Sequence, residues 1–234
     1  MIPQLSDASG QRMRSALLLL GLLMLIVTAF LVPAAPGSAA AQGMAVLYLA
    51  VFSVASYLIG ARRKWLVAYL ALAACIWIAG IAQAALPGTH HGLEIARTSL
   101  FSLLQLMLVW LVVRFSMFDP HASRPDRIVA GISGYLIIGF MWASLYALNE
   151  VIRPGGLVDS SDQALPGNDG ELLYYSLVTL TTTGYGDFVP VSPSARLLAS
   201  LESVAGTLYL AVFIAALLGK SETTAQVEAG TPSE

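Results

Sequence analysis

Charged residues are scarce in this chain of 234 residues: Asp, Glu, Lys and Arg together make up 11% of it, whereas hydrophobic residues make up 57%. An average soluble domain carries roughly a quarter charged residues. With a mean hydropathy of +0.74, the composition excludes a soluble globule and predicts a membrane protein. The net charge of −2 indicates no nucleic-acid partner, so the distribution of charge along the chain matters more than its sum.

Cysteine is almost absent as well. Cys75 stands alone within an apolar run, which excludes a disulfide or a cysteine-based metal site inside one chain, and we expect a small buried or lipid-facing side chain. The aqueous segments contain no glycine-rich phosphate loop, catalytic triad, metal-hydrolase spacing or pair of carboxylates. The sequence therefore predicts no enzyme activity and no cofactor.

Long apolar runs are abundant, and a run of about twenty such residues matches the hydrocarbon core of a bilayer. We expect an all-α membrane protein with six transmembrane helices and one shorter, re-entrant helix. The transmembrane helices are predicted at residues 15–33, 43–61, 65–86, 97–118, 128–151 and 194–219, and the re-entrant helix at 169–181.

These runs divide the chain into five parts. We predict a cytoplasmic N-terminus (1–14), a four-helix transmembrane domain (15–118), a cytoplasmic linker (119–127), a pore domain (128–219) and a short, disordered cytoplasmic tail (220–234). The first apolar run, with arginines before it and small residues after it, also resembles a secretory signal. Its length favours a retained first span, and cleavage is the alternative.

Basic residues are distributed unevenly about the predicted spans. With the N-terminus inside, only Arg97, Arg153 and Arg196 lie on the outer side, and the other Lys and Arg residues lie at cytoplasmic ends. Because Lys and Arg concentrate on the cytoplasmic side of membrane proteins, we expect both termini to be cytoplasmic. The alanine-rich composition is typical of a bacterial inner-membrane protein.

The most informative segment reads TTTGYGD and runs from Thr181 to Asp187. A potassium selectivity filter needs backbone carbonyls that all face one axis and replace the water around the ion. That arrangement requires residues of alternating handedness, and glycine adopts positive φ at little steric cost. Gly184 and Gly186 lie at alternate positions, as this geometry demands. Since four such strands close the ring and the chain has one, we expect a homotetramer.

The residues before this segment form the predicted half-span, 169–181, which is too short to cross a bilayer. Irregular backbone at membrane depth is tolerated only where protein buries it or where it lines water, so the segment that follows should line a pore. Tyr174 and Tyr175 lie on the outer part of the half-span and are predicted to support the filter; interfacial anchoring of these aromatic rings is the alternative.

Acidic residues collect on the predicted outer side. The group consists of Glu150, Asp159, Asp162, Asp169, Glu171 and Asp187. They form either a solvated loop or a negative vestibule that concentrates cations at the pore mouth. Because Asp187 directly follows the filter segment, we favour the vestibule and count Asp187 among the filter supports.

With outer helix, pore helix, filter and inner helix in that order, residues 128–219 resemble the pore domain of tetrameric potassium channels. The resemblance implies that K⁺ is bound by the carbonyls of Thr182, Thr183, Gly184 and Tyr185 and by the Thr182 hydroxyl, with Gly186 completing the ion-binding segment. The chain departs from the family pattern at Thr183, where many members have valine or isoleucine. It departs again at Val178, where some members carry a glutamate against the filter.

The resemblance implies a passive, potassium-selective ion channel with K⁺ as the permeant ion and membrane lipids around it. Two alternatives stay open. One is a non-selective cation channel of the same fold. The other is a membrane-coupled transport or regulatory subunit whose filter-like loop positions partners.

Upstream, the six-span plan resembles that of voltage-gated channels, but the charges that such a sensor needs are missing. A voltage sensor requires several basic residues in its fourth span, and no cation lies between Arg97 and Arg114. We therefore expect a non-sensing collar that contributes packing, lipid contacts or regulation. The short tail has no room for a ligand-binding domain, so such regulation requires a separate subunit. His90 and His91 indicate a polar turn, with a proton or metal sensor as the alternative.

The last predicted span contains two unusual residues. Glu202 is ionisable within an apolar helix, which marks it as functional by default; we expect it to support the filter by bonding to a hydroxyl of Ser176, Thr179 or Thr181, with Arg196 as the alternative partner. Gly206 is either a gating hinge or a site of close helix packing. A stripe formed by Leu210, Ile214 and Leu218 predicts either a hydrophobic gate at the cytoplasmic mouth or core packing.

Overall fold

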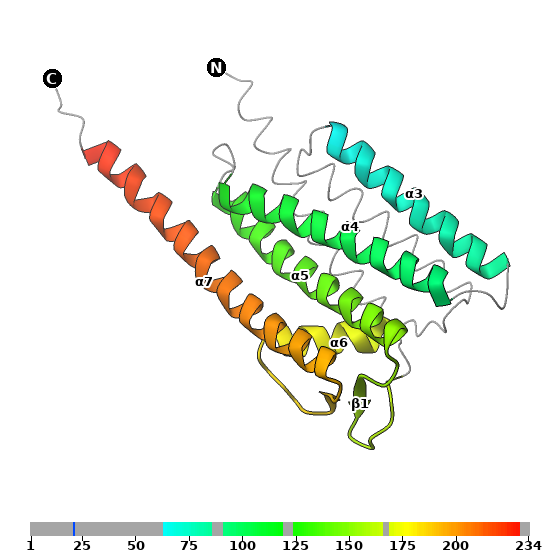
Figure 1. Ribbon diagram of the computed structural model, residues 1–234. Coiled ribbons are helices and arrows are strands. Elements are labelled where there is room, and N and C mark those ends of the chain that lie inside the picture. The colour runs from blue at the N-terminus through cyan, green and yellow to red at the C-terminus, as the bar shows by residue number, and fades with distance from the viewer. Residues whose placement is uncertain (1–20, 22–62, 86–90, 119–123, 166–168, 230–234) are drawn as a thin grey trace.

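The computed structural model in Figure 1 describes residues 21, 63–85, 91–118, 124–165 and 169–229. The predicted spans at 15–33 and 43–61, the N-terminus and His90 lie outside the described residues. Within them the chain forms five helices and two short strands. The helices are α3 (Arg63–Ala85), α4 (His91–Phe118), α5 (Arg124–Ile152), α6 (Asp169–Leu180) and α7 (Pro193–Ala229), and the strands are β1 (Leu157–Asp159) and β2 (Phe188–Pro190).

Three of the described helices are long and apolar enough to cross a membrane: His91–Arg114 in α4, Arg127–Ile152 in α5 and Pro193–Leu218 in α7. The apolar part of α3, Val67–Ala82, is shorter. The chain is thus a multi-pass membrane protein with an α-helical architecture. Six spans stay a prediction, because the first two lie outside the described residues and the apolar part of α3, Val67–Ala82, is shorter than a membrane span.

Helices α5 and α7 begin where proline allows a helix to begin. Pro125 and Pro193 lie in the first turn of these helices, where the missing N–H is not needed. Ser192 precedes α7, and its Oγ accepts a hydrogen bond from the backbone N–H of Ala195 at 3.1 Å. This is the geometry of an N-cap, which satisfies one of the unpaired N–H groups of the first turn.

At its other end α7 differs from the prediction. A disordered tail was expected after Gly219, but the helix continues to Ala229. The residues concerned include Lys220, Glu222, Ala225 and Gln226, which favour helix, and none of them is proline. The predicted stop relied on polarity, and polarity alone does not end a helix.

The helices pack in a consistent order, with α4 between α3 and α5, and with the short α6 against both α5 and α7. One apolar cluster joins α3, α4, α5 and α6, and includes Tyr69, Leu104, Leu108, Ile137 and Phe140. A second cluster joins α5, α6 and α7, and includes Trp142, Tyr146, Leu172, Tyr209 and Phe213. The second cluster fixes α6 relative to the two long helices that flank it, which positions the segment after α6.

The two strands form an antiparallel ribbon that the sequence analysis missed, since it expected only a loop there. Leu157 pairs with Pro190, Val158 with Val189 and Asp159 with Phe188. The ribbon lies at the end of the molecule where α5 ends and α7 begins (Figure 1). It therefore joins the stretch before α6 to the stretch after the TTTGYGD segment.

Cys75 on α3 is exposed, which agrees with the expected lipid-facing position. His91 is exposed in the first turn of α4. Its sensor role is untested, because its neighbour His90 lies outside the described residues.

Candidate functional site

The TTTGYGD segment leaves the C-terminal end of α6 and is held there by backbone hydrogen bonds. The N–H of Thr182 donates to the carbonyl of Thr179 at 2.9 Å, and the N–H of Thr183 donates to the carbonyl of Val178 at 2.9 Å. All six residues from Thr181 to Gly186 are exposed in the single chain. The segment is thus anchored, where it leaves α6, by carbonyls of that helix, and its remaining surface is not covered by its own chain.

Backbone conformation alternates along this segment. Thr182, Gly184 and Gly186 have φ angles of 57°, 58° and 78°. These are left-handed values, which glycine adopts readily and other residues adopt only at a cost. The expectation of left-handed backbone at the two glycines agrees with this geometry, and Thr182 extends the alternation one step further than the glycines predicted. Alternating handedness turns successive carbonyls towards the same side.

The outer end of the segment is tied to α6 by a side chain. The hydroxyl of Tyr174 donates to Asp187 Oδ2 at 2.7 Å, and the ring of Tyr174 meets that of Phe188 edge to face, with centroids 5.8 Å apart. The hydrogen bond to Asp187 is the main reason why the pKa of Tyr174 is raised to about 12. The phenol therefore keeps its proton, and remains the donor, at neutral pH.

The inner end of α6 is supported by hydroxyls from both neighbouring helices. Tyr135 on α5 donates to the carbonyl of Leu180 at 3.0 Å, and Ser203 on α7 donates to the carbonyl of Thr179 at 3.3 Å. Carbonyls in the last turn of a helix have no partner within the helix. The contact from Tyr135 gives the Leu180 carbonyl a partner, and the contact from Ser203 gives a second partner to the Thr179 carbonyl, which also accepts from the N–H of Thr182. Both contacts help to fix the point at which the segment begins.

Thr183, where the chain departs from the family pattern, makes a specific side-chain contact. Its hydroxyl lies 2.8 Å from the hydroxyl of Thr181, and the Thr181 hydroxyl donates to the carbonyl of Leu177 at 2.7 Å. Since the single hydroxyl proton of Thr181 is used for Leu177, Thr183 is the donor between the two threonines. The polar side chain therefore links the segment to α6.

Glu202 on α7 is completely buried. Its Oε1 lies 2.6 Å from the hydroxyl oxygen of Ser176, within hydrogen-bond distance, and its Oε2 accepts a hydrogen bond from Tyr146 at 2.6 Å. Ser176 was one of the three hydroxyls predicted from the sequence, and that prediction is confirmed. Arg196, the alternative partner, instead donates its Nε to the carbonyl of Pro190 at 3.1 Å.

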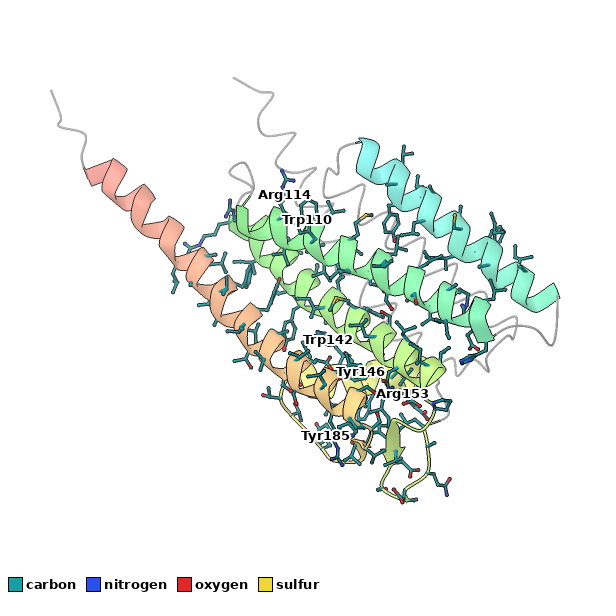
Figure 2. The ribbon with its side chains drawn as sticks, viewed as in Figure 1. Trp110, Arg114, Trp142, Tyr146, Arg153 and Tyr185 are labelled. Carbon is teal, nitrogen blue, oxygen red and sulfur yellow. The ribbon has the colours of Figure 1, made fainter. Side chains whose placement is uncertain are left out.

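Tyr175, the second predicted aromatic support, is buried on α6 and meets the ring of Tyr146 edge to face at a centroid distance of 4.9 Å. It packs behind the segment, among the helices, and is not an exposed interfacial anchor. Figure 2 shows Tyr146 close to α6, and it shows Tyr185 on the loop at that end of the molecule. The ring of Tyr185 is 70% exposed, so a single chain leaves most of its surface uncovered.

Gly206 lies against the end of α6. A Cβ atom at this position would be 2.3 Å from the backbone oxygen of Leu180 and 2.9 Å from Leu180 Cδ1. A side chain cannot be accommodated there unless α6 or α7 moves. Close packing, one of the two explanations considered, is thus an observed property of this glycine.

The predicted stripe on α7 lies on the surface. Leu210, Ile214 and Leu218 are 43%, 54% and 60% exposed. Packing in the core of a single chain therefore does not account for them, and a gate formed by several chains stays a hypothesis.

The acidic residues predicted on the outer side differ in their hydrogen bonds and surroundings. Glu150 accepts hydrogen bonds from the N–H groups of Gly155 and Leu157, and Asp159 Oδ1 accepts them from Ser161 and Gln163. These two carboxylates shape the loop before α6. Burial, followed by the carboxylate of Asp159, raises the pKa of Glu171.

Sequence reasoning missed three of the supporting residues, Tyr135, Tyr146 and Ser203. A signal for the two tyrosines existed, because they lie 11 residues apart in one predicted span. About three turns of an α-helix separate such residues, so both project from one face. Two phenols on one face of an apolar helix indicate hydrogen-bond partners in the neighbouring helices.

Comparisons with known proteins agree with this geometry. Residues 151–220 match a family model described as "Ion channel". That stretch includes the end of α5, the ribbon, α6, the TTTGYGD segment and most of α7. The chain thus contains an ion-channel pore region, and the matched family is one of channels and not of enzymes.

Two curated proteins are similar to part of the chain. One is the inward rectifier potassium channel Kirbac3.1 of Paramagnetospirillum magnetotacticum, 34% identical over 79 residues, which cover 33% of this chain and 24% of the relative. The other is the two-pore potassium channel 1 of Arabidopsis thaliana, 33% identical over 89 residues, which cover 37% of this chain and 21% of the relative. The chain thus matches less than a quarter of the length of either relative, and no solved structure matches it.

Proposed function

We propose that the chain is one subunit of a homotetrameric, potassium-selective channel that conducts K⁺ passively across the cell membrane. The ion ligands are the carbonyls of Thr182, Thr183, Gly184 and Tyr185, together with the Thr182 hydroxyl. The observation that carries this proposal is the alternation of left-handed φ at Thr182, Gly184 and Gly186, because it directs successive carbonyls to one side. Both similar proteins are potassium channels by name, which supports the choice of ion.

Four copies are required to complete the ion site. One strand supplies carbonyls on one side of an ion, whereas a dehydrated K⁺ needs oxygens all round it. Tyr185 is largely exposed in one chain, and apolar side chains such as Leu201, Val204 and Leu208 cover an exposed face of α7. A fourfold assembly covers such surfaces with neighbouring subunits and lipid.

Gating takes place at the filter or at the inner mouth, without a conventional voltage sensor. Between Arg97 and Arg114, α4 carries no cation, so a change of membrane potential exerts little force on it. The candidate gate consists of Gly206 with the exposed stripe of Leu210, Ile214 and Leu218. In a fourfold arrangement this stripe forms a hydrophobic constriction.

Reconstitution of the purified protein in planar bilayers tests the function. With K⁺ on one side and Na⁺ on the other, we expect single-channel currents whose reversal potential lies far from zero, and block by barium. A reversal potential near zero indicates a non-selective cation channel. Absence of current, together with a monomeric particle by native mass spectrometry, indicates the transport or regulatory subunit.

A further inference from the structure

Glu202 links three helices behind the pore helix. It belongs to α7, and its two oxygens lie 2.6 Å from the hydroxyls of Tyr146 on α5 and Ser176 on α6. The Ser176 hydroxyl also lies 2.8 Å from the carbonyl oxygen of Gly139 on α5. Three short contacts between oxygen atoms therefore meet at one completely buried carboxyl group and one buried serine.

The number of hydroxyl and carboxyl hydrogens determines whether all three contacts can be hydrogen bonds at the same time. Each of the three contacts needs one hydrogen, and each hydroxyl carries only one. Tyr146 supplies the first, to Glu202 Oε2. Ser176 can donate either to Gly139 or to Glu202, but not to both. An ionised carboxylate adds no proton and leaves one contact without hydrogen.

A protonated Glu202 completes the set. Its Oε1–H donates to Ser176 Oγ, Ser176 donates to the Gly139 carbonyl, and Tyr146 donates to Oε2. Every acceptor then has a donor at a distance of 2.6–2.8 Å. The geometry fits the neutral acid better than it fits the carboxylate.

The electrostatic surroundings also favour the neutral form. The titratable groups facing Glu202 among the described residues are phenols, namely Tyr135 and Tyr146 on α5 and Tyr175 on α6. None of these three carries a positive charge. A buried carboxylate without a cation is strongly disfavoured.

We propose that Glu202 is a positioning residue that, as a neutral acid, holds α6 against α5 and α7 and so keeps the filter conductive. Loss of its proton takes the Ser176 hydroxyl away from Gly139 and leaves a charge behind the filter. The α5–α6 contact then weakens, and conduction falls as pH rises. This inference deepens the proposed function and rests on it only for the readout by current.

The decisive variant is Glu202→Gln in the full-length protein, because the amide reproduces the neutral acid. Its NH₂ group donates to Ser176 and its carbonyl accepts from Tyr146. Glu202→Ala removes both contacts, Ser176→Ala removes the link to Gly139, and Tyr146→Phe is the control for titration of a phenol.

Infrared spectroscopy tests the protonation directly, independently of any current. At neutral pH we expect the wild type to show the carbonyl-stretch band of a protonated carboxylic acid, sensitive to deuterium, and Glu202→Gln to lack it. The melting temperature of the assembled wild-type protein should fall as pH rises from about 6 to about 9, because the unfolded chain has already lost this proton whereas a buried glutamate keeps its proton up to about pH 8–9. The Glu202→Gln protein should melt independently of pH over that range.

Bilayer currents test the effect on conduction. Wild-type current should fall about tenfold over the same pH range, which corresponds to about 1.4 kcal/mol, while Glu202→Gln current stays constant and Tyr146→Phe keeps the decline. Glu202→Ala and Ser176→Ala should be low throughout. A missing Glu202-dependent band, or a Glu202→Gln protein that follows the wild-type pH profile, overturns the inference. Absence of K⁺ current from the wild type instead refutes the proposed function, while the band and the melting profiles still decide the role of Glu202.

Discussion

At the scale of single residues, the TTTGYGD segment depends on its backbone conformation, and neighbouring side chains hold it in place. Gly184 has a φ of 58°, and a Cβ atom added there meets nothing within 4 Å. The requirement for glycine is therefore conformational and not a matter of space. Tyr174 and Asp187 then secure the outer end of the segment through one hydrogen bond.

We predict that Gly184→Ala lowers K⁺ flux into liposomes at least about tenfold. An L-residue in left-handed backbone costs about 1–2 kcal/mol, and in a tetramer four strands bear that cost at once. The control is Gly80→Ala in α3, which also meets nothing within 4 Å but has no left-handed φ. It should leave flux unchanged, and equal flux from both variants would contradict the assignment.

The link between Tyr174 and Asp187 can be isolated by a double-mutant cycle. Tyr174→Phe keeps the edge-to-face contact with Phe188 and removes only the hydroxyl, while Asp187→Ala removes the acceptor. We expect several-fold faster amide hydrogen exchange across residues 183–189 in each single variant. The double variant should be no faster than the singles, because both remove the same bond. Additive effects would refute this coupling.

At this scale, the sequence predicted those features of single residues that depend on chemistry local in the chain. The alternation of Gly184 and Gly186 was predictable because handedness follows from the presence or absence of a Cβ atom. The left-handed φ of Thr182 was not, since a threonine adopts it only when its surroundings impose it. The pairing of Glu202 with Ser176 was predictable as one of three options, whereas Tyr146 required knowledge of which face of α5 meets α7.

At the scale of elements, the site depends on how closely α7 approaches the end of α6. Gly206 permits that approach, because the backbone oxygen of Leu180 occupies the space of its missing side chain. Hydroxyls of Tyr135 and Ser203 add hydrogen bonds to the same turn of α6. The start of the TTTGYGD segment is thus defined jointly by α5 and α7.

We predict that Gly206→Ala destabilises the assembled protein by about 1–3 kcal/mol, the usual cost of overpacking. Thermal unfolding in detergent measures this, and amide exchange near Leu180 should increase because α6 is displaced. If Gly206 acts only as a hinge, stability and exchange remain as in the wild type and only the opening rate changes.

Elements that consist of a long hydrophobic run were predicted well. Elements that form through contacts between distant segments were predicted poorly. The run at 128–151 corresponds to α5, Arg124–Ile152. The ribbon was not predicted from the sequence because β1 and β2 have only three residues each, which is too few for an alternating pattern. Its two strands also lie far apart in sequence. The continuation of α7 to Ala229 was not predicted because a polar helix has no apolar periodicity in its sequence.

At the scale of the whole molecule, the ion-channel region and the helices before it differ in how they pack. The second apolar cluster joins α5, α6 and α7 around the ion-channel segment. Helix α4 packs against α5, and α3 packs against α4. In α4 the basic residues lie towards the ends, and the guanidinium of Arg114 lies over the ring of Trp110 at 5.5 Å. Figure 2 shows this pair at the end of the molecule away from Tyr185.

We predict that open probability in bilayers changes less than about twofold between −100 and +100 mV. Each elementary charge that crosses the field contributes about 2.3 kcal/mol per 100 mV, and the described part of α4 offers none between its two arginines. Arg97→Gln and Arg114→Gln should leave this flat response unchanged. A steep sigmoidal dependence on voltage would contradict the assignment of a non-sensing collar.

The pairing of Asp159 with Phe188 brings the two ends of residues 160–187 together, so this insert, which contains α6 and the TTTGYGD segment, leaves and rejoins the helical scaffold at adjacent points. Loop-closure entropy grows only slowly with length, so extra residues at the exposed tip near Ser160 and Ser161 lengthen the insert without shifting its two anchor points. A peptide tag or fluorophore grafted there should sit on the rim of a channel that still conducts.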